Sequence, residues 1–162
     1  MDTAKPESAD LVIRRARSED VPRIAALIMF GTPTQAMTPA EIEAEAAHPD
    51  YLDAFAKIEA SPNDAVFVAE QAGAVIGTFQ VTLIPGLIAR GRMRAKFESV
   101  HVAPERRGQG VGAIMIAHAL AFARDNGAAL AELTSNKVRT DAHRFYVRLG
   151  FEQSHEGFKM VL

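Results

Sequence analysis

Three glycines follow two arginines in the stretch APERRGQGVGAIM, which spans residues 103–115. Glycine leaves the backbone uncrowded, so that successive N–H groups can point at one ligand. The apolar run after the glycines is typical of a helix, and the start of a helix adds unpaired N–H donors and partial positive charge. Arg106 and Arg107 add formal charge nearby. The stretch therefore predicts a phosphate site, although a turn that merely enters a helix has similar residues.

The spacing of these glycines differs from that of two other phosphate-binding loops. The dinucleotide fingerprint is Gly-x-Gly-x-x-Gly, whereas Gly108, Gly110 and Gly112 follow Gly-x-Gly-x-Gly. The nucleoside-triphosphate loop needs Gly-Lys-Ser or Gly-Lys-Thr, and the sequence has no such triplet. What remains is the pattern Arg-x-x-Gly-x-Gly from Arg107 to Gly112.

The composition is that of one globular domain. The chain has 162 residues, of which 48% are hydrophobic and 23% charged, enough to bury a core. Residues 1–10 are polar and acidic without a secretory apolar region, so we expect a disordered tail before a single domain over residues 11–162. Apolar runs are far shorter than the ~20 residues of a membrane helix, so we expect no membrane partner.

The absence of cysteine excludes disulfides, thiolate nucleophiles and cysteine-based metal sites, and it is compatible with the cytoplasmic location that we expect. The histidines show no ligand spacing with carboxylates, so we expect no metal site. A net charge of −2 argues against a dedicated nucleic-acid binder.

The charges are unevenly distributed along the chain. Between Thr38 and Glu70 lie eight acids against the single base Lys57. Between Arg90 and Arg107 lie six bases against two acids; the bases are Arg90, Arg92, Arg94, Lys96, Arg106 and Arg107. Two interpretations stay open: solvated faces of opposite sign, or a basic segment that receives an anion.

Hydrophobic periodicity and turn residues predict the elements that position these residues. Strands are expected over 11–17, 65–70, 74–84, 96–102 and 129–135, with a final hairpin over 151–162 that turns near Glu156 and Gly157. Helices are expected after a Ser18 cap, after a Thr38–Glu41 capping box, over 51–60, from Val111 onward and over 141–149. We expect residues 85–95 to form no regular secondary structure. This order predicts an α/β fold.

The hexapeptide from Arg107 to Gly112, after a strand that ends VHVAP, resembles the acyl-CoA pyrophosphate loop of the GCN5-related N-acetyltransferases, the GNAT family. The segment TSNKVRTDAHRFYVRLGF supports this resemblance independently, and the order of elements agrees over residues 11–162. Within the family, DAHRFYVRLGFEQSH is most similar to aminoalkylphosphonate N-acetyltransferases. That likeness is confined to the last third of the chain and says little about the acceptor.

The resemblance implies a mixed, mostly antiparallel sheet with helices on both faces and a parallel pair of central strands that splay. It implies acetyl transfer from acetyl-CoA to a primary amine of a small molecule, by direct attack in a ternary complex because no cysteine can form an acyl-enzyme. Two alternatives are a protein lysine or N-terminus as acceptor, and a catalytically silent acyl-CoA-binding or regulatory module. Many relatives pair as dimers, so a homodimer is expected by analogy only.

The resemblance also implies roles for cofactor-binding residues. Backbone amides would hold the acetyl-CoA pyrophosphate from Arg107, Gly108, Gln109, Gly110, Val111 and Gly112. The main chain at Val100 and Val102 would pair with the pantetheine arm. Asn136 would place its amide against the cofactor, but an Asx-type turn is an equal alternative there.

For the chemistry, Tyr146 stands where the family carries a general acid, which protonates the departing thiolate; the alternative is a core tyrosine. Glu98 is the candidate base, acting through water, unless it is an ordinary surface glutamate. His101 has a suitable ordinary pKa, but strand alternation would make it and Glu98 face opposite sides.

Three arginines, Arg90, Arg92 and Arg94, precede the splayed strand in a region that lines the acceptor site in this family. Guanidinium forks suit carboxylate and phosphonate groups, so an anionic amine is expected. The competing interpretations are contact with the adenosine 3′-phosphate or with solvent.

Overall fold

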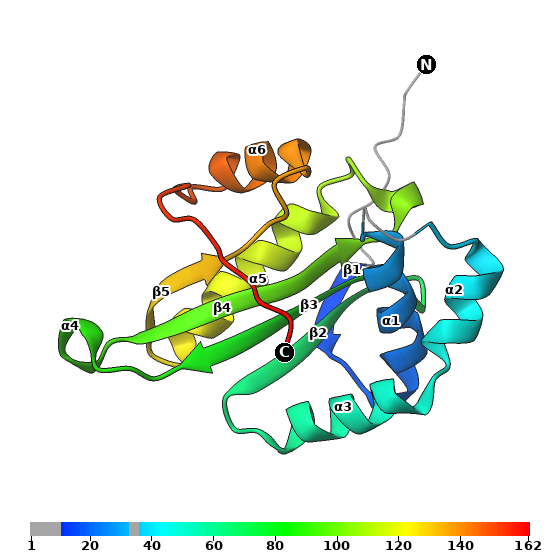
Figure 1. Ribbon diagram of the computed structural model, residues 1–162, viewed down its shortest axis with the longest axis horizontal. Coiled ribbons are helices and arrows are strands. Elements are labelled where there is room, and N and C mark those ends of the chain that lie inside the picture. Colours follow the sequence, from blue (N-terminus) through cyan, green and yellow to red (C-terminus); the bar gives the residue numbers. More distant parts are fainter. Residues whose placement is uncertain (1–10, 33–35) are drawn as a thin grey trace.

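The computed structural model describes residues 11–32 and 36–162, so the predicted tail over residues 1–10 lies outside the described residues. Five strands form one sheet in chain order: β1 (Leu11–Arg15), β2 (Asp64–Gln71), β3 (Ala74–Ile84), β4 (Met93–Val102) and β5 (Ala128–Leu133) (Figure 1). The first four strands pair antiparallel and β4 pairs with β5 in parallel. The predicted mixed sheet with one parallel pair is confirmed.

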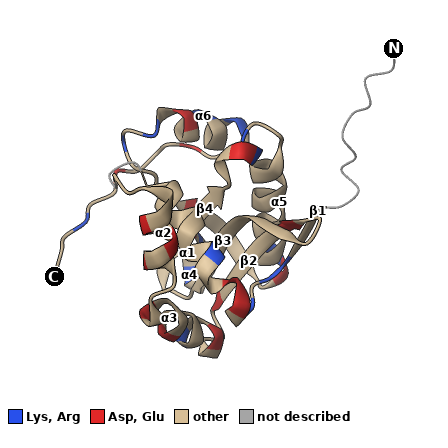
Figure 2. Cartoon of the chain, turned by 90° about the vertical axis from the view of Figure 1, so that its right-hand side faces the viewer, with Lys and Arg blue, Asp and Glu red and all other residues tan. Residues whose placement is uncertain are grey.

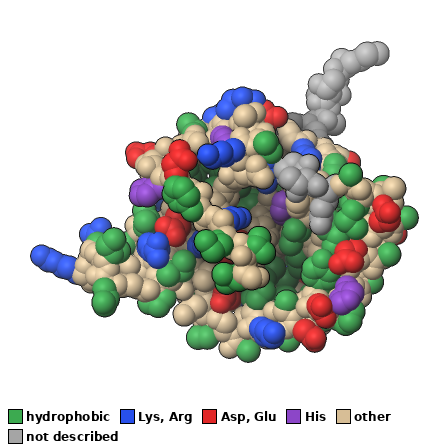
Figure 3. All heavy atoms as spheres, viewed as in Figure 1, with side chains coloured by type: hydrophobic (Ala, Val, Ile, Leu, Met, Phe, Trp, Pro, Cys, Tyr) green, Lys and Arg blue, Asp and Glu red, His purple; other side chains and the backbone are tan. Residues whose placement is uncertain are grey.

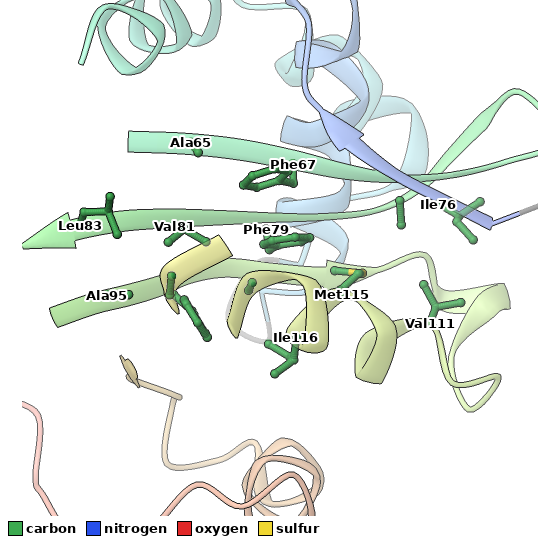
Figure 4. Packing of buried hydrophobic residues seen from close by; sticks show 14 residues of the cluster. Ala65, Phe67, Ile76, Phe79, Val81, Leu83, Ala95, Val111, Met115 and Ile116 are labelled. Carbon is green, nitrogen blue, oxygen red and sulfur yellow. The ribbon is translucent and has the colours of Figure 1, made fainter. Parts of the chain in front are cut away.

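Helices cover both faces of this sheet (Figures 1 and 2). One face carries α5 (Val111–Asp125), and the other carries α1 (Val21–Phe30) and α3 (Pro49–Ala60), with α2 (Pro39–Ala46) packed on α1. The main core lies between α5 and the sheet, where Phe67 and Phe79 meet Met115 and Ile116 (Figure 4). The remaining helical pieces are α4 (Ile88–Gly91), α6 (Thr140–Arg148) and short 3-10 turns at Ser18–Asp20 and Pro104–Arg106.

Local sequence signals explain several boundaries. The Thr38 hydroxyl accepts from the Glu41 N–H and the Glu41 carboxylate accepts from the Thr38 N–H, so the predicted capping box is confirmed. The predicted cap by Ser18 is wrong, because Ser18 opens a 3-10 turn and it is the Asp20 carboxylate that accepts from the Arg17 N–H at 2.8 Å. Asp20 is buried and also accepts two hydrogen bonds from Arg14, which lower the pKa of its carboxyl.

Two further boundaries differ from prediction. Strand β4 begins at Met93 instead of Lys96, so Arg94 lies in the sheet and not in an irregular loop. The predicted final hairpin is also wrong, because residues 151–162, all of them described, form no strand. In the described structure this segment finds no strand partner, and cross-strand partners are what stabilise a β conformation.

Candidate active site

Strands β4 and β5 part in the middle of β4. Their pairing runs from Met93 opposite Ala128 to Phe97 opposite Leu133 and ends there. Beyond Phe97, β4 continues to Val102 with described partners in β3 only. The backbone N–H and C=O groups of this stretch that face β5 are therefore open to an extended ligand chain, and this stretch contains Val100 and Val102.

A β-bulge at Ser99 changes which way the next side chains point. Glu98 lies opposite Gln80, and His101 lies opposite Thr78, so three steps along β4 match two steps along β3. Ser99 takes the extra place with φ of +51°. Because directly opposed residues share a face, Glu98 and His101 point to the same side of the sheet. The prediction that they face opposite sides is wrong.

The His101 ring lies against the end of α1. A Cβ placed on Gly31 would lie 1.9 Å from the His101 Nδ1, and Gly31 has an ordinary φ of −90°, so its glycine is required by space and not by backbone conformation. Among the described residues, Nδ1 is buried without a hydrogen-bond partner. Burial, together with the positive charges of Arg139 and Arg107, lowers the pKa of His101 to about 4. The imidazole is therefore neutral near pH 7.

This lowered pKa predicts a loss of stability in mild acid. The folded state favours the neutral ring, so its contribution is complete above pH 6.5, the ordinary pKa, and is lost as pH falls towards 4. This pKa shift corresponds to a loss of about 3 kcal/mol in the free energy of unfolding. Urea unfolding of the wild type and of His101→Gln at pH 7 and pH 4.5 measures it, and the variant should lose less stability between the two values. Equal losses would contradict the assignment to His101.

Two glycines of the predicted phosphate loop adopt the left-handed backbone conformation that favours glycine. Gly108 and Gly110 have φ of +75° and +84°, and a Cβ on either would meet nothing within 4 Å. Gly110 directly precedes α5, whose first N–H groups have no partner inside the helix. At Gly112 glycine is required by packing. A Cβ there would come within 3.2 Å of the Phe145 ring, so the absence of a side chain lets α6 pack against the start of α5.

Side chains of the same loop turn onto neighbouring backbone. The Arg107 Nε donates to the Val102 carbonyl at 3.2 Å, and the Gln109 amide donates to the Glu105 carbonyl at 3.1 Å. Arg107 thereby ties the loop to the end of the splayed strand. Because both side chains bond to carbonyl groups, they occupy none of the backbone amides that are predicted to hold the pyrophosphate.

Tyr146 lies one aromatic ring away from the point where the strands part. The Phe151 ring contacts Phe97, the last residue of β4 that pairs with β5, with centroids 6.3 Å apart, and it contacts Tyr146 with centroids 5.8 Å apart. Burial raises the pKa of the Tyr146 phenol, and the positive charge of Arg139 opposes that rise. The phenol is therefore protonated at neutral pH and can act as a proton donor.

The other two polar candidates, Glu98 and Asn136, make local polar contacts. Glu98 is exposed, and its carboxylate lies 3.0 Å from the Lys96 ammonium. The Asn136 side-chain oxygen accepts from the Val138 N–H at 3.1 Å, which is the Asx-type turn that the sequence left open. The Asn136 amide nitrogen can still serve as a donor, so both site assignments remain predictions.

The three predicted substrate arginines lie at the end of β4 that is remote from the glycine loop (Figure 1). Arg90 belongs to α4 and has a left-handed φ of +62°, and both it and Arg92 are exposed. Arg94 forms an ion pair with Glu132 on β5 at 3.1 Å. From Arg94 to Glu98 the strand advances about 13 Å. Their contact with an acceptor remains a prediction.

The face that carries α1 is hollowed beside the last segment of the chain (Figure 3). A hollow of about 120 Å³ lies between α1, α3 and the sheet, and Ser99 and Gln80 bring polar groups to its mainly apolar wall. A second hollow of about 370 Å³ lies at the far end of α3, where the Asp64 carboxylate already accepts from Ser61 and Thr82.

Sequence reasoning missed three residues of this site. Ser99 carries no signal, because a bulge at a residue other than glycine leaves no mark in the hydrophobic pattern. The sequence gives no sign of the role of Gly31, since its partner His101 lies far away along the chain. Arg139, whose charge acts on both His101 and Tyr146, lies just before α6 in the segment that carried the family resemblance.

Within residues 11–32 and 36–162 no helix is long and apolar enough to cross a membrane. The same residues contain no group of three or more histidine, aspartate and glutamate side chains placed to hold a metal ion.

The comparisons with known proteins show the family to which this chain belongs. The model of the acetyltransferase (GNAT) family matches residues 22–151. The chain is 33% identical to an aminoalkylphosphonate N-acetyltransferase of Salmonella typhimurium, over 93% of this chain and 90% of that one. The chain belongs to the GNAT family and to its class of enzymes, the acetyl-CoA-dependent N-acetyltransferases.

Two solved structures show how closely the fold is shared. A protein of Bacillus halodurans C-125, described as a transcriptional regulator, is 33% identical with a TM-score of 0.84 and covers 94% of this chain and 99% of its own. A protein of Clostridium acetobutylicum, described as a "predicted acetyltransferase with acetyl-CoA", is 16% identical with a TM-score of 0.67, over 93% of this chain and 96% of its own. The second likeness shows the fold alone.

Proposed function

We propose that this chain transfers the acetyl group of acetyl-CoA to the primary amine of a small molecule that carries an acidic group. The observation that supports the reaction is that α6 lies against both the phosphate loop and the point where β4 and β5 part. Its Phe145 packs on Gly112 beside the phosphate loop, and its Tyr146 lies one ring from Phe97, where β4 and β5 part. One helix thus joins the two ends of a site for an extended acyl-CoA molecule.

The proposed chemistry needs two proton transfers. The amine nitrogen attacks the thioester carbonyl, a C–N bond forms and the C–S bond breaks. The departing sulfur takes the proton of the Tyr146 phenol, and the amine nitrogen gives its proton to a base. Glu98, acting through water, and His101 are the candidates for that base, and the Ser99 bulge makes both face the same side.

Two observations support an acidic group on the acceptor. Arg107 and Arg139 lie close enough to His101 for their charges to lower its pKa, so this end of the site is positive. The relative from Salmonella typhimurium is named for aminoalkylphosphonates, which carry both an amine and an acidic group. The hollow between α1 and α3 is apolar enough to receive a short hydrocarbon part of the acceptor.

Thiol release from acetyl-CoA, measured over a panel of amines, tests this proposal. Each aminoalkylphosphonate and amino acid is paired with an alkylamine of equal chain length that has no acidic group. We expect kcat/KM to be at least ten-fold higher for the acidic member of each pair, since one charge-assisted contact contributes about 1.5–3 kcal/mol. A preference for neutral amines, or for peptides that contain lysine, would contradict the proposed acceptor class.

A second candidate function is a regulatory module that binds acyl-CoA without turnover. The observation that favours it is the 33% identical relative of Bacillus halodurans, which is described as a transcriptional regulator. The same panel separates the two functions. Tight binding of acetyl-CoA without thiol release on any amine, peptides included, would favour the regulatory module.

A further inference from the structure

The larger of the two hollows lies at the far end of α3 and takes no part in the proposed reaction. Its volume of about 370 Å³ is near the lower end of the range for small-molecule sites. Phe55, Ile58 and Pro62 bring apolar side chains to the wall of this α3 hollow, and Asp64 brings a carboxylate. An apolar wall with a few polar groups is typical of a site for a small organic ligand.

The wall that contains Asp64 is held in place by the turn after α3. The Asn63 N–H donates to the Ser61 hydroxyl at 3.2 Å, and the Asn63 carbonyl accepts from the Leu83 N–H at 2.7 Å. The Ser61 hydroxyl in turn donates to the Asp64 carboxylate at 2.7 Å. The turn is thereby tied to the end of β3, so its residues need little reordering when a ligand binds.

The Asp64 carboxylate has hydrogen-bond donors but no positive partner. Besides the Ser61 hydroxyl, it accepts from the Thr82 hydroxyl at 2.5 Å and from the Gln80 amide at 3.5 Å. Burial opposes its ionisation, but these hydrogen bonds outweigh burial and lower the pKa of Asp64, so the group is charged at neutral pH. In the part of the chain that the structure describes, no lysine, arginine or histidine forms an ion pair with it.

Arg15 also lines the α3 hollow, but its charge lies on the other face of the sheet. The Arg15 guanidinium lies 5.1 Å from the ring centroids of both Phe67 and Phe122, and Phe122 belongs to α5. The charges that surround the hollow are acidic. The exposed Glu59 lines it, and acidic residues are spread along α2 and α3 (Figure 2). The field at the hollow therefore favours a cation.

We propose that the α3 hollow binds a small organic ammonium ion, that is, an amine with a short hydrocarbon part. Each carboxylate oxygen has two lone pairs, and the Asp64 Oδ2 accepts from Ser61 only, so an ammonium N–H can donate to the other lone pair. The hydrocarbon part packs on Phe55 and Pro62, and an aromatic ring beside a carboxylate is a favourable surrounding for an ammonium group.

A metal ion fits the α3 hollow less well than an organic cation does. Metal ions that prefer oxygen ligands need several of them, and the described residues contain no group of three or more histidine, aspartate and glutamate side chains placed to hold one. An apolar wall likewise offers a metal ion nothing, whereas it removes the hydrocarbon part of an amine from water.

The amine site lies beside the proposed acceptor site but selects the opposite charge. Phe55, Ile58 and Val66 line both hollows and so stand between them. At the acceptor end, the charges of two arginines favour an acidic group. Asp64 instead repels one. An amine with an acidic group therefore suits the active site, and an amine without one suits the α3 hollow.

Titration of ¹⁵N-labelled protein with n-butylammonium, followed by NMR without acetyl-CoA, tests the site in the absence of turnover. We expect saturable shifts of the amides from Ile58 to Val66 with a Kd of about 1 mM, which so small a ligand can reach. The matched neutral ligand is 1-butanol, which has the same number of heavy atoms. It should bind at least ten-fold more weakly, because it cannot form a charge-assisted hydrogen bond.

Asp64→Asn should weaken the binding of n-butylammonium at least ten-fold, because asparagine keeps the shape of the side chain and loses the charge. Asp53→Asn is the matched control. It removes the same charge from an exposed position of α3, and it should change the Kd by less than about two-fold, because exposed charges act weakly. The amide spectra of both variants show whether the fold is kept.

Four outcomes would overturn the proposal. The first is no saturable shift up to about 10 mM n-butylammonium. The second is equal affinity for n-butylammonium and 1-butanol, because the hollow would then select hydrocarbon and not charge. The third is equal weakening by Asp64→Asn and Asp53→Asn. The fourth is a set of shifts confined to α1 and Ser99, which would place the amine in the acceptor hollow.

The comparison of the two ligands uses the wild type, so it decides even if Asp64→Asn does not fold. Because none of these measurements requires acetyl transfer, a failure here leaves the proposed reaction untouched. A failure of the reaction on every acceptor leaves the amine site untouched in the same way.

Discussion

Replacing Tyr146 by phenylalanine is expected to lower kcat by about 10²–10⁴-fold, the usual contribution of a general acid. The substitution removes only the phenol oxygen, so the ring contacts with Phe145 and Phe151 remain and the fold is kept. The departing sulfur then has to leave as a thiolate or take a proton from water. The KM for acetyl-CoA should change little, because the proposed role of the phenol is in the transition state.

The pH dependence of kcat distinguishes this role from that of a core tyrosine. Burial raises the pKa of Tyr146, so the wild type should stay active into alkaline solution and lose activity only when the phenol ionises. In Tyr146→Phe this alkaline decrease should disappear along with most of the rate. A variant that keeps more than half of the wild-type kcat would show that Tyr146 serves packing alone.

The features that the sequence predicted well are local ones. The capping box at Thr38 is set by residues within one turn of a helix start, and the structure confirms it. The left-handed backbone at Gly108 and Gly110 likewise follows from residue type, because only glycine adopts such φ values without strain. The family resemblance added the parting of β4 and β5, which no local pattern contains.

The features that the sequence missed depend on residues far apart in the chain. Alternation along β4 fails at Ser99, because the bulge is fixed by pairing with β3 and serine gives no sign of a positive φ. The sequence groups Gly112 with the glycines of the phosphate loop, yet the space beside its Cα is taken by Phe145, 33 positions later (145 − 112). The final hairpin was predicted from a true strand pattern, but a pattern does not say which edge it pairs with.

Gly110→Ala is expected to weaken acetyl-CoA binding by at least ten-fold, about 1.4 kcal/mol in binding free energy. Gly110 has φ of +84° at the start of α5, and its Cβ position points into open space beside the proposed phosphate loop. A methyl group there costs roughly 1–2 kcal/mol in the left-handed backbone and occupies the space that phosphate oxygens need. Isothermal titration with acetyl-CoA measures the loss of affinity.

Gly127→Ala separates those two effects, because Gly127 has nearly the same backbone at the other end of the same helix. Its φ is +83°, its Cβ would also meet nothing within 4 Å, and it follows the end of α5 that carries no free N–H groups. Both variants should therefore lose similar stability in urea, while only Gly110→Ala loses affinity. If both lose affinity equally, the effect comes from general destabilisation and the phosphate loop lies elsewhere; a difference confined to Gly110 ties the pyrophosphate to this turn.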